Sequence, residues 1–129
     1  MMSKKIHEFN DMIRKLRKEL FGKGPERIRT VFVDNMAVST LYGNLTASEQ
    51  FIASTPEGRE MVHAARTTLI QKHYSNHVPE GMEELIGAKL EHLFTDIKIQ
   101  EDIAVSVFIF DRNIEGVAEN RKSLQGHEQ

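Results

Sequence analysis

The chain has 129 residues, of which 40% are hydrophobic and 28% charged, as is typical of one soluble globular domain with a buried core. It contains no cysteine, which excludes a disulfide framework, a thiolate nucleophile and cysteine-ligated zinc. No apolar run approaches the roughly 20 residues that cross a bilayer, so we expect a cytoplasmic protein that reaches a membrane only peripherally, through a partner.

The net charge of −2 hides an uneven distribution along the chain. The first 29 residues hold nine Lys and Arg against four acidic residues, a net charge of +5, whereas the other hundred residues carry −7. Such a division predicts that the first element meets an acidic surface, which is lipid, nucleic acid, a partner protein or the acidic remainder of the same fold.

Residues 3–21 are predicted to form a helix with an apolar seam, because apolar residues recur three and four positions apart. The seam consists of Ile6, Phe9, Ile13, Leu16 and Leu20. We interpret it as the side that packs on a sheet. The alternatives are pairing with the helix of a second copy and, last, a helix lying in a membrane interface. The polar side carries the cations Arg14, Lys15, Arg17 and Lys18.

A hinge follows this helix. Gly22 is suited to a left-handed helix cap, and Pro25 prevents the helix from continuing. The backbone of Gly22, Lys23 and Gly24 could also bind an anion, with Arg27 or Arg29 near the site. A helix cap and turn is the simpler interpretation of the same residues.

The rest of the chain predicts a hairpin, helices and a second hairpin. Alternating β-branched residues indicate strands at 27–33 and 36–42 around the turn residues Asp34 and Asn35. Thr46 and Glu49 form a capping box for a helix over 47–54, and Thr55 caps a longer helix over 57–76. We expect the buried side of that longer helix to hold Met61, Val62, Ala65, Leu69, Ile70 and Tyr74.

After a further helical turn over 80–86, two strands are predicted at 90–99 and 103–111. The second of these is apolar on both faces and therefore belongs in the middle of the sheet. We predict the α+β class, with a four-stranded antiparallel sheet, adjacent hairpins and helices mainly on one face. The domain is expected to cover 1–112, followed by a polar tail over 113–129.

No catalytic constellation can be recognised. His73 and His77 have the four-residue spacing of a two-histidine metal pair, but no third ligand follows, and histidines are also favoured at a helix end by the helix dipole. They are weak metal candidates, and we expect no cofactor. An RNA-binding aromatic run is also missing, so nucleic acid is not an expected partner.

Four segments together resemble the small bacterial family called MpsC-like, over about residues 5–112. They are Gly22-Lys23-Gly24-Pro25-Glu26, Leu45-Thr46-Ala47-Ser48-Glu49, Glu57-Gly58-Arg59 and the apolar strand that ends at Asp111-Arg112. The family takes its name from a component of a sodium-translocating system that generates membrane potential and is associated with inorganic-carbon supply. The resemblance implies an accessory domain of a membrane transport system and carries no catalytic residues.

Two hypotheses about function follow. In the first, the chain is an accessory interaction module, dimeric through its first helix or a sheet edge, whose basic N-terminal face binds an acidic protein partner. In the second, it is a regulatory domain that binds a small ligand or anion near the hinge.

Overall fold

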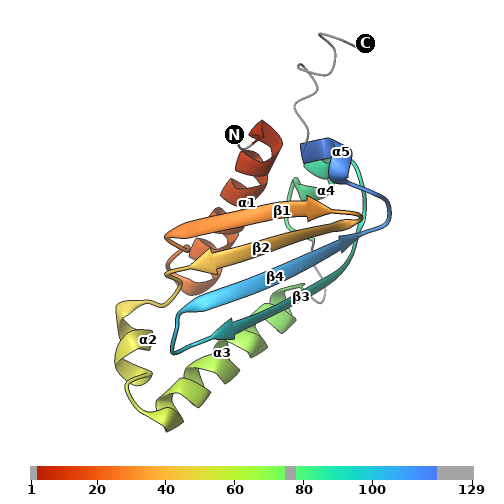
Figure 1. Ribbon diagram of the computed structural model, residues 1–129. Coiled ribbons are helices and arrows are strands. Elements are labelled where there is room, and N and C mark those ends of the chain that lie inside the picture. The colour runs from red at the N-terminus through yellow and green to blue at the C-terminus, as the bar shows by residue number, and fades with distance from the viewer. Residues whose placement is uncertain (1–2, 75–77, 119–129) are drawn as a thin grey trace, which may run out of the picture.

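The computed structural model describes residues 3–74 and 78–118. In chain order its elements are α1 (Lys4–Phe21), β1 (Arg27–Val33), β2 (Met36–Tyr42), α2 (Ala47–Ile52), α3 (Pro56–Tyr74), α4 (Met82–Ile86), β3 (Leu90–Lys98), β4 (Ile103–Phe110) and α5 (Glu115–Ala118). The strands form one antiparallel sheet in the order β1-β2-β4-β3. Figure 1 looks onto a face of this sheet that no helix crosses, with α1 and α4 behind it.

This architecture confirms the predicted α+β class and the adjacent hairpins. β4 is a central strand, as its apolar composition predicts, because it pairs with β2 on one side and β3 on the other. No helix in the described part of the chain is long and apolar enough to cross a membrane.

Local sequence signals explain where the helices begin and end. Ser3 caps α1 by accepting a hydrogen bond from the Ile6 N–H, and Gly22 ends it at φ 86°, donating to the Lys18 carbonyl. Thr46 and Glu49 complete the predicted capping box of α2. Hydroxyl and glycine chemistry at these positions therefore determines the element boundaries.

The hydrophobic core lies between the helices and the covered face of the sheet. Phe9 of α1 is fully buried and stands edge-on to Phe32 and Phe108, with ring centroids 5.6 and 5.2 Å away. Leu41, Met82 and other buried residues of the strands and of α4 surround these rings.

Two helices bury only part of the side that their apolar residues predict. In α1 the predicted Ile6, Phe9 and Ile13 are buried, but Leu16 and Leu20 are only half-buried. Asn10 and Arg17 face the core in addition.

In α3 the described side chains that are buried are those of Val62, Arg66 and Ile70, while Met61 and Leu69 are 63% and 39% exposed and Ala65 is also exposed. The Tyr74 side chain lies outside the part of the chain that the structure describes. These three buried residues are spaced four apart because α3 meets the sheet mainly along the edge strand β3, which buries only a narrow stripe of the helix.

The residues that follow 112 also pack on the domain. Ile114 is 1% exposed, and its N–H donates to the Asp34 carbonyl in the turn of the first hairpin. Glu115 accepts a hydrogen bond from the Asp34 N–H, so the short helix α5 is tied to the same turn. Ile114 and Val117 are too few apolar residues to establish a periodicity, which is why the sequence predicts a polar tail here.

Candidate functional site

The four cations predicted for the polar side of α1 occupy two environments. Arg17 is only 5% exposed and faces the sheet. Arg14 pairs with Asp11 on the same helix, at 3.0 Å. Lys15 and Lys18 are exposed and make no ion pair with the described residues. Of these four cations, Lys15 and Lys18 are therefore the two that offer a positive charge without an ion pair to the described residues.

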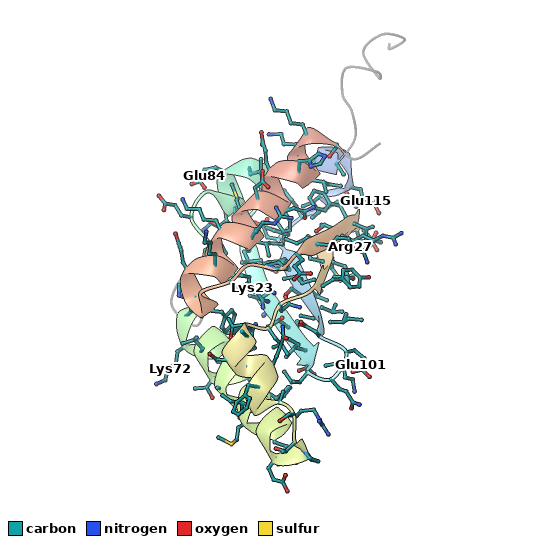
Figure 2. All side chains as sticks on the ribbon, turned by 90° about the vertical axis from the view of Figure 1, so that its left-hand side faces the viewer. Lys23, Arg27, Lys72, Glu84, Glu101 and Glu115 are labelled. Atoms are coloured by element: carbon teal, nitrogen blue, oxygen red, sulfur yellow. The ribbon has the colours of Figure 1, made fainter. Side chains whose placement is uncertain are left out.

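The hinge residues and the arginines of β1 do not converge on one anion site. Lys23 bonds to Glu26 and to the Leu45 carbonyl, both at 3.2 Å. A Cβ on Gly24 would lie 2.9 Å from the Arg14 backbone oxygen, so this glycine allows the hinge to pack closely on α1. Arg27 points to the other side of the sheet, where its guanidinium lies 4.2 Å from the Tyr42 ring centroid (Figure 2).

A row of hydroxyl groups crosses the covered face of the sheet. Register aligns Thr30, Ser39, Ser106 and Thr95, one from each strand. Asn10 of α1 accepts a hydrogen bond from Thr30 at 2.6 Å. Since this uses the one hydroxyl proton of Thr30, Ser39 donates to Thr30 across the 2.7 Å between them.

At the other end of this row, Arg17 donates to Ser106 at 3.1 Å and to Thr95 at 3.3 Å. The hydroxyl row thus positions a buried guanidinium on the sheet.

Arg17 and Arg66 both line a cavity of about 410 Å³ between α3 and β3. Thr67, Gln71 and Thr95 add polar groups, and the remaining lining is mostly apolar: Ile70, Leu93, Phe94, Ile97 and Ala104, together with the carboxylate residue Asp96. Such a mixture of apolar walls with a few polar groups is typical of small-ligand sites.

Arg66 is held by a second buried network. Its Nε and Nη2 atoms donate to the two carboxylate oxygens of Glu49, at 2.8 and 2.7 Å, and Nη2 also donates to the Asn44 carbonyl. Its guanidinium lies 4.1 Å from the Phe21 ring centroid. Burial raises the pKa of the Glu49 carboxyl, but hydrogen bonds from Arg66 and the Thr46 backbone outweigh it, so the pKa lies below the usual 4.5.

The uncovered side of the sheet, which we call the open face, consists of the outward side chains of all four strands. They stand in four cross-strand rows: Val33, Met36, Ile109 and His92; Val31, Val38, Val107 and Phe94; Arg29, Thr40, Val105 and Asp96; Arg27, Tyr42, Ile103 and Lys98. Phe94 is 61% exposed and Val31 50%. Figure 2 shows α1 and α3 on the opposite side of the strands.

At one edge of the open face, Asp96 is held by α3. His63 Nε2 and Asp96 Oδ1 lie 2.7 Å apart, and the Ile97 N–H donates to the same oxygen. The hydrogen bond from His63, with that from Ile97, lowers the pKa of the Asp96 carboxyl below its usual value.

The metal candidates receive no further ligand. Within residues 3–74 and 78–118 no three His, Asp or Glu side chains gather as a metal site would require. His73 lies beside a groove with Lys15 and Glu80, while His77 lies outside the described residues.

Sequence reasoning missed the pairing of Glu49 with Arg66 and the role of Asp102. The Asp102 carboxylate accepts hydrogen bonds from the N–H groups of Asn44 and Leu45, linking the second hairpin turn to the end of the first hairpin. A possible signal was the arginine between Val62 and Ile70 at four-residue spacing, since a cation on a buried stripe requires an acidic partner.

A family model matches nearly the whole chain. The family model described as the Na+-translocating membrane potential-generating system (MpsC) matches residues 2–112. Over 124 residues the chain is 79% identical to the uncharacterized protein YrhF of Bacillus subtilis, covering 96% of this chain and 99% of that protein. It is 24% identical over 112 residues to the uncharacterized protein YbcI of the same organism, covering 84% and 86%. No solved structure matches the chain.

Proposed function

The chain belongs to the MpsC family, and from this premise we propose that it is an accessory assembly module of a Na+-translocating membrane potential-generating system. The family's name supplies the cellular context. The open face supports the role, because it marks the chain as a part of a larger complex.

Exposure of the open face is the observation that carries this proposal. Val31, Val33, Phe94 and Val105 are each between 39% and 61% exposed, and they lie on one continuous surface. Scattered apolar residues are normal on a protein surface, but a contiguous apolar patch marks an interaction site. A protein surface that covers this face is therefore expected in the working complex.

The helix side supplies a second contact. Lys15 and Lys18 project from α1 without ion pairs to the described residues, so they can meet an acidic surface on a membrane-embedded subunit. Arg17 is excluded from this contact by burial, and Arg14 is already paired with Asp11.

Retention of the full chain in a membrane-bound complex tests the proposal. We expect a tagged chain to co-purify with detergent-solubilised membranes of the cells that produce it, and to be released at high salt. Reversing Lys15 and Lys18 to Glu together, or introducing Val107→Asp, should lower retention at least about tenfold.

Lys89→Glu is the control for charge reversal, since it reverses a lysine on an exposed loop residue outside both surfaces. Vesicles of pure anionic lipid separate protein binding from lipid binding. Equal retention of all variants, or equal binding to protein-free vesicles, would contradict the proposal.

A second candidate function, regulation by a small anion, is favoured by the cavity between α3 and β3. A guanidinium group is suited to a carboxylate or similar anion, and the apolar walls to a compact ligand body. Arg66 is already paired with Glu49, so Arg17 is the candidate contact for the anion. At least one of bicarbonate, phosphate and nucleotides should stabilise the folded chain, by about 2.7 kcal/mol when the ligand is at a hundred times its Kd. This stabilisation should appear as a higher melting temperature. No stabilisation by any of them would count against this candidate.

A further inference from the structure

The charges on the open face are arranged so that the face complements itself. Its third row begins with Arg29 on the edge strand β1 and ends with Asp96 on the edge strand β3. Arg29 is exposed and makes no ion pair with the described residues. Both hydrogen bonds that Asp96 accepts from the described residues use Oδ1, so its other carboxylate oxygen accepts none from them.

We propose that a second copy of this chain covers the open face, related to the first by a two-fold axis that runs parallel to the strands. This inference rests on the proposed function in one respect, namely that protein covers this face. It adds the identity of the occupant, the orientation and the charge pairs.

Rotation about an axis parallel to the strands keeps each row at its own level and exchanges the two edges. β1 then lies over β3 of the second copy, so Arg29 faces Asp96 of that copy, and the symmetry makes this pair twice. The second row brings Val31 over Phe94, and Val38 over Val107, while the first row brings Met36 over Ile109 and Val33 over His92. Two sheets packed face to face in this way lie about 10 Å apart with strands within about 30° of each other, which an arginine side chain can span.

The other two-fold axis that allows aligned packing runs across the strands and reverses the order of the rows. Arg29 would then face Val31 of the second copy, and Asp96 would face Phe94. Burying a charged group against an apolar one is costly, because its hydration is lost without a compensating partner. The charges therefore select the axis parallel to the strands.

The last row limits the affinity. Arg27 would face Lys98 of the second copy, but this row lies at the rim, where solvent screens like charges. Seven residues at about 3.3 Å and four strands at about 4.8 Å make the face roughly 23 Å by 19 Å. A patch of this size is at the small end of specific interfaces, so a dissociation constant on the order of micromolar is expected.

Sedimentation velocity of the full chain from about 1 to about 200 μM tests the inference, since this range brackets a micromolar constant. The chain should change from monomer to dimer with concentration. Val107→Asp should weaken the dimer at least about a hundredfold, because it places a carboxylate in the apolar centre. A monomer at every concentration, or a dimer unaffected by Val107→Asp, would overturn the proposal and would instead indicate that another protein or another surface is involved.

Charge exchange tests the orientation. Arg29→Glu and Asp96→Lys should each weaken the dimer about tenfold or more, and the double variant should recover most of the loss, because the pair is restored with its signs exchanged. Lys98→Glu should tighten the dimer by opposing Arg27. Single variants without effect, or a double variant no better than the singles, would rule out this axis.

Glu84→Lys on α4, which lies away from the open face (Figure 2), and Lys89→Glu on an exposed loop residue are the controls. Circular dichroism checks that every variant is folded. The same variants, measured for retention in the membrane-bound complex, separate the two proposals. A monomer that is retained through its open face would refute the second copy and keep the assembly role. A dimer that is never retained on membranes would refute the assembly role and keep the second copy.

Discussion

Arg66 and Arg17 are charged residues in the least accessible parts of their helices, and they flank the same aromatic ring. Their guanidinium carbons lie 4.1 and 5.7 Å from the Phe21 ring centroid. Glu49 neutralises Arg66 through two short hydrogen bonds, while Arg17 bonds to the hydroxyl row. Such groups stabilise a fold only while their partners remain, because a buried charge that has lost its partner lowers the free energy of unfolding.

Glu49→Gln should lower the free energy of unfolding at pH 7 by about 2–3 kcal/mol, because the amide cannot accept both hydrogen bonds or balance the charge of Arg66. The pKa of Glu49 is lowered in the fold, so its contribution is fully present above the unfolded value near 4.5. It is lost as pH falls through the lower folded pKa.

Urea unfolding at pH 7 and below pH 4.5 measures both effects, and the difference between the two proteins should shrink in acid. Glu57→Gln, which changes an exposed carboxylate in the first turn of α3, is the control. A constant difference at all pH values would contradict this account of the pair.

At the scale of elements, the boundaries were predictable because they depend on neighbours in sequence. Both strands of the first hairpin and the cap at Gly22 were predicted from turn and cap residues alone. Burial was less predictable, since it depends on which neighbour each helix meets. α3 contacts an edge strand, so Met61 and Leu69 stay exposed although they are apolar.

The C-terminal segment shows the same limitation and yields a prediction. Ile114→Ala should lower the free energy of unfolding by about 2–4 kcal/mol, because it removes a nearly inaccessible side chain and leaves a cavity between α5 and the first hairpin. Urea midpoints measure this loss, and Glu84→Ala, at an exposed position on α4, should change stability by no more than about 0.5 kcal/mol. A loss below about 1 kcal/mol would show that the segment contributes little to the fold.

At the scale of the whole molecule, we propose separate roles for the two sides: the open face forms the dimer, and α1 binds the membrane system. Two copies joined through their sheets would form four layers, with both α1 helices on the outside and their Lys15 and Lys18 side chains pointing away from each other. Two docking helices on one particle would raise the effective affinity for a membrane system with more than one binding site. The basic first segment therefore takes no part in the dimer contact, but its binding to the membrane system is strengthened by the dimer.

The sequence alone determined the fold class, the hairpins, the helix caps and the family, because periodicity, turn chemistry and motif order are local properties of the chain. Only the tertiary structure decided where the +5 charge of the first segment goes. Arg17 is buried on the hydroxyl row, Lys15 and Lys18 remain on the outside of α1, and Arg27 and Arg29 are on the open face. A side chain's partners depend on which strands and helices become neighbours, and sequence spacing does not contain that information.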